Sequence, residues 1–136
     1  MAELMFVPVC GRIMIIILLY VYEVRSLWNF PKKDWTLFKV KIVIWQENRM
    51  AKLCSEYAKL LSSSAPSSEK FWALDERLRH DKRSASVCVR MSRSEMPFII
   101  LRLLDEGAIT IDDLAEFSDE MKAYVEFHII NHSKES

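Results

Sequence analysis

The stretch MPFIILRLLDEGAITIDDL, residues 96–114, decides the fold because it contains the signals for two successive helices and for the turn between them. Apolar residues follow Pro97 almost without interruption to Leu104, which predicts a largely buried helix. Ser94 is placed to cap this helix, and Pro97 then lies in the first turn, where its missing N–H is not needed. Gly107 can adopt the left-handed conformation that often ends a helix.

The second helix of this stretch is predicted to begin at Thr110, which is spaced to form a capping box with Asp113. Apolar residues at helical spacing continue this helix toward Ile130, namely Leu114, Phe117, Met121, Tyr124 and Val125. Ser118 offers an alternative, because a serine at that point can cap a new helix and divide the segment in two. Residues 131–136 are expected to form a polar, frayed tail.

Residues 103–114 (LLDEGAITIDDL) resemble the short bacterial C-terminal helical hairpin called SHOCT. In that hairpin a leucine helix, a glycine, an Ile-Thr pair and the acidic start of a second helix follow one another. The corresponding residues here are Leu104, Gly107, Ile109-Thr110 and Asp112-Asp113-Leu114. The chain departs from the family in its longer acidic second helix, which lacks the basic finish. The resemblance implies a helical hairpin that serves in oligomerisation or interaction.

Two further helices are predicted upstream. Residues 46–61 carry apolar side chains at helical spacing, and the segment SSSAPSS at 62–68 is a linker in which Pro66 prevents helix continuation. Ser68 can cap the next helix, which is predicted over residues 68–82. The apolar side of that helix consists of Phe71, Leu74 and Leu78, widened by Trp72.

The fold class expected from these elements is mainly α, a small four-helix module over about residues 46–130. Val87, Val89 and Met91 alternate with Cys88 and Arg90, which predicts either a short β segment at residues 87–91 or an extended connector.

An apolar N-terminal segment, residues 1–45, precedes the module. Residues 4–22 are strongly apolar, but Arg12 near their middle disfavours a membrane-spanning helix, which leaves a membrane-proximal tether as one alternative. The run LFKVKIVIW at 37–45 predicts a buried strand with Phe38, Val40, Ile42 and Ile44 on one face.

A further interpretation concerns Met50. The sequence Met50-Ala51-Lys52 looks like a natural start of translation, and the residues before it differ in composition from those after it. On this interpretation residues 1–49 are an over-called extension without a selected function, and the membrane alternative does not apply.

The composition excludes several classes of protein. Hydrophobic residues make up 51% and charged residues 28% of the 136, which is ordinary globular composition, and the net charge is zero. Gly11 and Gly107 are too few for a phosphate-binding glycine-rich loop. The odd number of cysteines and the lack of CxxC spacing argue against a disulfide framework and a zinc ribbon, and indicate a reducing, cytoplasmic compartment. Cys54 and Cys88 lie in apolar surroundings and are expected to be buried.

Charge is segregated along the chain. Residues 69–93 have a net charge of +3 and residues 94–126 a net charge of −7. The basic candidates for an interaction surface are Arg77, Arg79, His80, Lys82, Arg83, Arg90 and Arg93. Such a cluster in the 77–93 region suggests an alternative function as a small nucleic-acid-associated regulator. The acidic helix after Gly107 opposes helix-turn-helix docking, because phosphates would repel it.

No residues stand out as catalytic, cofactor-binding or metal-ligating. His128 and His132 share a helix face but lack the glutamate of the HExxH motif. The acids between Asp112 and Glu120 do not fit the calcium-loop spacing. The function expected from the sequence is therefore a non-enzymatic protein–protein interaction module that self-associates, with an unidentified protein or a second copy as its partner.

Overall fold

The computed structural model describes residues 28–135. Within that part the chain forms four α-helices and one 3₁₀ helix, in the order α2 (Lys32–Leu61), α3 (Ser67–Asp81), α4 (Met96–Asp105), η2 (Ile111–Leu114) and α5 (Asp119–Lys134). The predictions of a mainly helical fold and of four helices are confirmed. By its contacts the chain divides into two units, residues 1–30 and 31–136.

Helix α2 corrects the prediction of a strand at residues 37–45. The helix begins directly after Pro31 and continues without a break to Leu61. Phe38, Ile42 and Trp45 are buried at helical spacing, whereas the β-branched residues between them face outward. Burial of this one side stabilises a helix although the local residues favour a strand, as tertiary packing often does. The boundary drawn between residues 45 and 46 lies inside α2.

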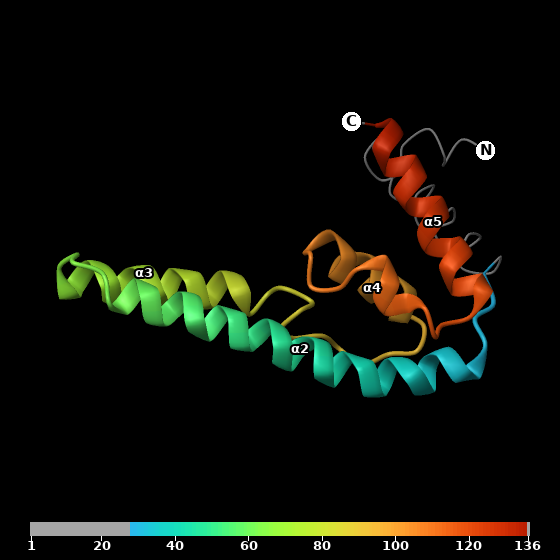
Figure 1. The fold of residues 1–136 in the computed structure, drawn as a ribbon, viewed down its shortest axis with the longest axis horizontal. Coiled ribbons are helices and arrows are strands. Elements are labelled where there is room, and N and C mark those ends of the chain that lie inside the picture. Colours follow the sequence, from blue (N-terminus) through green and yellow to red (C-terminus); the bar gives the residue numbers. More distant parts are fainter. Residues whose placement is uncertain (1–27, 136) are drawn as a thin grey trace, which may run out of the picture. The chain divides into compact units, whose positions relative to one another are not determined.

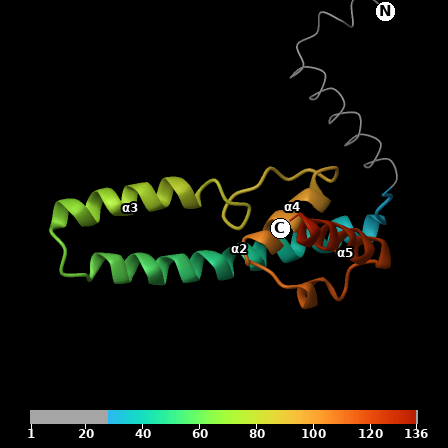
Figure 2. The same cartoon turned by 90° about the horizontal axis from the view of Figure 1, so that it is seen from above.

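Helices α2 and α3 form an antiparallel hairpin, and both views show them side by side (Figures 1 and 2). The predicted linker is confirmed as the turn between Leu61 and Ser67, although Pro66 rather than Ser68 occupies the cap position of α3. Leu74 and Leu78 are half-buried. Phe71 and Trp72, predicted on the same apolar side, are instead 63% and 64% exposed.

Residues 82–95 connect α3 to α4. Residues 87–91 belong to this connector and form no strand, so the extended connector was the better of the two interpretations. Cys88 lies here and Cys54 lies on α2, and both thiols are exposed, contrary to the expectation of burial. Apolar neighbours in the sequence did not indicate burial of the two cysteines, because few elements pack over the second half of α2 and over the connector.

Helix α4 and its ending follow the sequence closely. Pro97 lies in the first turn, with Glu95 rather than Ser94 at the cap position. Gly107 has a φ of 70°, in the left-handed region. The N–H groups of Gly107 and Ala108 donate to the carbonyls of Leu104 and Leu103, at 3.1 and 2.9 Å. These two bonds form a Schellman motif, which satisfies the last carbonyls of the helix and reverses the chain.

The segment after Gly107 divides in two, which was the alternative based on Ser118. Thr110 and Asp113 form the predicted capping box, but it starts the short helix η2. Ser118 then caps α5 by accepting a hydrogen bond from the N–H of Met121. Helix α5 extends to Lys134, so most of the expected polar tail is helical. All five apolar residues predicted on this segment are buried, namely Leu114, Phe117, Met121, Tyr124 and Val125.

The core lies between the first half of α2, α4, η2 and the start of α5. The largest fully buried apolar side chains are Phe38, Met96, Ile100, Leu103, Leu114 and Met121. Trp45 stacks on Phe117 with ring centroids 6.3 Å apart, which fixes α2 against the entry to α5. Among the helices of residues 28–135, none has the length and apolar composition needed to cross a bilayer. The apolar stretch 4–22 lies outside the described residues. Of the extension expected upstream of Met50, residues 28–49 are described, and Phe38, Ile42 and Trp45 within them belong to the buried core.

Candidate functional site

The seven predicted basic residues lie at the end of α3 and in the connector that follows. Arg77, Arg79 and His80 belong to the last turns of α3. The other four, Lys82, Arg83, Arg90 and Arg93, are exposed on the connector. The structure therefore places all seven in one region of the chain, but their surroundings divide them into two groups.

Arg77 is held between acidic and aromatic side chains of the hairpin. It donates a hydrogen bond to Glu56 on α2 and lies 4.0 Å from the carboxylate of Asp81. Its guanidinium also lies 5.5 Å from the ring centroid of Tyr57, within cation–π range. The hydrogen bond with Glu56 raises the pKa of Arg77, against the opposing effect of burial. Arg77 is thus a structural cation of the α2–α3 contact.

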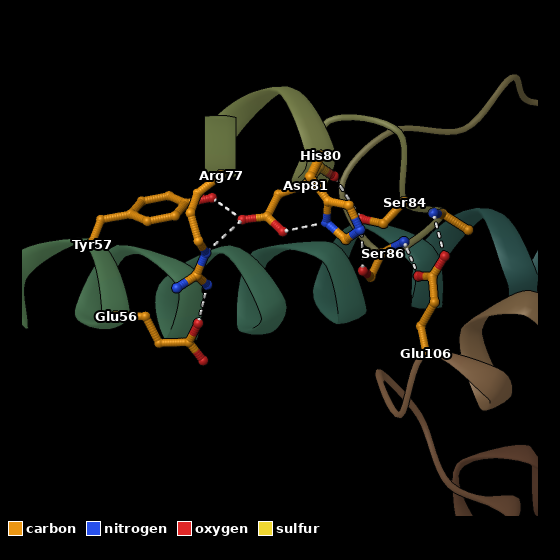
Figure 3. Close-up of polar contacts among 9 residues, drawn as sticks. Glu56, Tyr57, Arg77, His80, Asp81, Ser84, Ser86 and Glu106 are labelled. Atoms are coloured by element: carbon orange, nitrogen blue, oxygen red, sulfur yellow. Dashed lines mark hydrogen bonds and ion pairs between the residues drawn. The ribbon is translucent and has the colours of Figure 1, made fainter. Parts of the chain in front are cut away.

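Tyr57 and Asp81 join the two helices at the centre of this network (Figure 3). The Tyr57 hydroxyl donates to Asp81, whose residue surface is only 9% exposed. Burial and the bond to Asp81 raise the pKa of Tyr57 to about 12. Burial alone would raise the pKa of Asp81, but the hydrogen bonds with Tyr57 and His80 and the positive charge of Arg77 together outweigh it and lower that pKa. The hydroxyl is therefore held as a donor and the carboxylate as its ionised acceptor.

Arg79 and His80 also have acidic neighbours. Arg79 forms an ion pair with Asp75 at 2.8 Å, one turn earlier on α3. The Nδ1 atom of His80 lies 3.4 Å from Asp81, although most of its side chain is exposed. Arg77 and Arg79 thus have much of their charge compensated locally, and His80 also lies beside an acid. This arrangement weakens the field that the 77–93 region can present to a polyanion.

The connector is fixed by polar contacts that the sequence did not reveal. The carboxylate of Glu106, at the end of α4, accepts hydrogen bonds from the N–H groups of Ala85 and Ser86, each at 2.9 Å (Figure 3). The side chain of Gln46 donates to the carbonyl of Ala85 at 3.2 Å. These contacts join residues far apart in the sequence, and no local spacing signals them.

Asp34 is a second buried polar group that sequence reasoning missed. Its carboxylate is fully buried and accepts from both the backbone N–H and the hydroxyl of Ser118. Ser118 in turn caps α5, so Asp34 positions the start of that helix. The only signal in the sequence was Asp34 in the first turn after a proline, which is common in helices of every function.

Two of the acidic residues between 112 and 120 have partners within the described chain. Asp113 completes the capping box of η2, and Glu116 forms an ion pair with Lys41 at 3.0 Å. His128 makes a contact of 2.8 Å with the carbonyl of Tyr124. Within residues 28–135, no group of three or more potential ligands is arranged to hold a metal ion.

Large apolar side chains are also exposed on α2 and α3, and they are the other candidates for an interaction surface. Those on α2 are Val40, Val43, Ile44, Met50 and Leu61, and those on α3 are Phe71 and Trp72. The rings of Phe71 and Trp72 contact each other edge to face, with centroids 5.1 Å apart. Such groupings on a small chain are typical of sites that bind other proteins.

Comparison with known proteins gives no relative for this arrangement. No protein-family model matches the chain, and neither the curated proteins nor the solved structures contain a significant match.

Proposed function

We propose that this chain is a non-enzymatic protein–protein interaction module that self-associates. The observation that supports the proposal most is the exposure of apolar side chains on both helices of the α2–α3 hairpin. Burying aromatic and aliphatic side chains away from water is favourable, by about 25 cal/mol for each Å² of apolar surface. A partner that covers them would therefore bind with a favourable apolar contribution.

The small number of buried residues between α2 and α3 supports the same proposal. After Leu53 no residue of α2 is fully buried, and on α3 the only buried residue is Asp81. A pair of helices with so little apolar surface between them gains stability when another chain packs on it. The resemblance of residues 103–114 to SHOCT hairpins points in the same direction, because that family is associated with oligomerisation or interaction.

Nucleic-acid binding through the basic region has less support. Arg77, Arg79 and His80 lie beside Glu56, Asp75 and Asp81, so they offer little charge to phosphates. The exposed residues Lys82, Arg83 and Arg90 remain available on the connector. The acidic stretch 94–126 follows directly, and its net charge of −7 opposes approach of a polyanion.

Sedimentation velocity of the full chain over a wide range of concentration tests the proposal. We expect the weight-average sedimentation coefficient to rise with concentration, as in a reversible association, and to change little with moderate salt because the contact is mainly apolar. A monomer at every concentration would contradict self-association.

A further inference from the structure

Helix α2 carries apolar residues on two opposite sides. One side packs into the core through Phe38 and Ile42. An α-helix has 3.6 residues per turn, so Val40, Val43 and Ile44 lie on the opposite side. Their side chains are 60%, 65% and 51% exposed. A helix on the surface of a protein normally has polar residues there. The outward side of α2 therefore presents apolar side chains to solvent.

The outward residues follow a regular spacing. We define the α2 seam as positions 40, 44, 47, 51, 54, 58 and 61, which are occupied by Val40, Ile44, Glu47, Ala51, Cys54, Ala58 and Leu61. Steps of four and three residues alternate along it, which is the 3.5-residue repeat of helices that pack along their length. All seven residues are exposed, and Figure 1 shows α3 and α4 together on one side of α2. The seam is about 30 Å long, at 1.5 Å per residue.

We propose that the α2 seam is the surface through which two copies of this chain pair, with their α2 helices antiparallel. This inference rests on the proposed self-association and identifies its interface. Ala51, Cys54 and Ala58 are small, so the centre of the seam allows two helix axes to approach closely. The bulkier Ile44 and Leu61 lie toward its ends.

The seam complements itself in the antiparallel direction. A two-fold axis between Lys52 and Leu53 places Ile44 opposite Leu61 of the second copy, by residue count along the helix. The same axis places Ala51 opposite Cys54, and Glu47 opposite Ala58. Each contact thus joins two positions of the same seam, as a two-fold interface between identical chains requires.

Charge selects the antiparallel direction over the parallel one. Parallel helices would place the Glu47 carboxylates of the two copies against each other in an apolar seam, which is strongly unfavourable. They would also bring together the two stretches 94–126, each with a net charge of −7. In the antiparallel pair Glu47 meets Ala58, and the two acidic stretches lie at opposite ends.

Variants of the seam in the full chain test the interface. Ala58→Glu adds a charge to an exposed seam position, and Ser55→Glu adds the same charge to an exposed position on the same helix outside the seam. We expect Ala58→Glu to weaken the dimer at least about tenfold in sedimentation velocity. Ser55→Glu should leave the dissociation constant nearly unchanged, and Glu47→Leu should lower it. Equal effects of Ala58→Glu and Ser55→Glu would overturn the proposal.

Disulfide trapping tests the direction. In a background in which Cys10, Cys54 and Cys88 are replaced by serine, Ile44→Cys and Leu61→Cys are prepared separately and then mixed under mild oxidation. The antiparallel pair predicts crosslinked dimers in the mixture and few in either variant alone. Crosslinks within each variant alone would instead indicate parallel helices and overturn the proposed geometry.

The outcomes separate this inference from the proposed function. A chain that self-associates but does not respond to Ala58→Glu would retain the proposed function and contradict the α2 seam. A chain that is monomeric at every concentration would contradict both. A monomer whose Ile44→Cys thiol resists labelling by a maleimide would assign the seam to another segment of the same chain.

Discussion

Tyr57 and Asp81 join two helices that bury little apolar surface between them. The lowered pKa of Asp81 means that folding favours its carboxylate form, so its stabilisation is present above the ordinary pKa of about 3.8 and is lost as pH falls further. The pKa of Tyr57 is raised from 10.0 to about 12, so its stabilisation is present below pH 10 and is lost as pH rises through about 12. The contact is therefore complete across the neutral range.

Replacing Tyr57 with phenylalanine should open the hairpin. Tyr57→Phe removes the donor and leaves a buried carboxylate with one partner fewer, a change that costs about 1.5–3 kcal/mol for a hydrogen bond to a charged group. Native-state hydrogen exchange at neutral pH should show this loss in the opening free energy of the α3 amides. Ultraviolet titration of the unmodified chain should show a tyrosine ionising near pH 12 that Tyr57→Phe lacks.

Asp75→Asn is the matched control for this variant. It breaks the exposed ion pair with Arg79 on the same helix, and exposed pairs contribute about 0–1 kcal/mol. Equal destabilisation of α3 by Tyr57→Phe and Asp75→Asn would show that the Tyr57–Asp81 bond does not hold the hairpin.

Among the helices, α5 depends on a residue of another helix for its start. Asp34 on α2 accepts both the N–H and the hydroxyl of Ser118. Asp34→Ala should lower the free energy of unfolding by at least about 1.5–3 kcal/mol, because both donors lose a charged acceptor in a buried site. Asp34→Asn should cost less, since its amide oxygen still accepts one bond. Urea unfolding followed by circular dichroism measures both variants.

Asp112→Ala serves as the comparison for Asp34→Ala. Asp112 is an exposed acid in the first turn of η2, so its removal loses only a favourable charge near a helix start, about 0.3–1 kcal/mol. An unfolding free energy that Asp34→Ala leaves unchanged would contradict the role assigned to that carboxylate.

The sequence predicts the helices around Gly107 and Ser118 better than it predicts the first half of α2. The end of α4 at Gly107 and the cap at Ser118 follow from signals within a few residues, so local chemistry is sufficient there. The first half of α2 contains many β-branched residues, and it is helical because Phe38 and Trp45 pack against distant elements. Contacts between residues far apart in the sequence cannot be predicted from the spacing of residues within one segment.

The candidate site shows the same limit. The sequence identified the basic residues of α3 and the connector, but it did not show that Glu56, Asp75 and Asp81 lie beside three of them. It also gave no sign that Phe71 and Trp72 would be exposed, because an apolar residue on a helix is equally compatible with a core and with a binding surface. Only the positions of neighbouring helices decide between the two.

At the scale of residues 31–135, helix α2 connects two regions of unequal packing. Its first half contributes Phe38, Ile42 and Trp45 to the core, whereas beyond Leu53 it contacts α3 mainly through polar and half-buried groups. Regions with few buried apolar contacts open with a lower free energy than the core. The second half of α2 and the packed α3 should therefore open at a lower free energy than the core.

Hydrogen exchange should therefore divide α2 within a single helix. We expect amides of residues 38–45 to exchange only through global unfolding and those of residues 54–61, with the amides of α3, to exchange through a local opening of lower free energy. Raising the protein concentration should increase the protection of the 54–61 amides, because pairing along the α2 seam covers residues 44–61 and links their local opening to dissociation. Uniform protection along α2 that does not depend on concentration would contradict both the weaker second half of α2 and its coverage by a second copy.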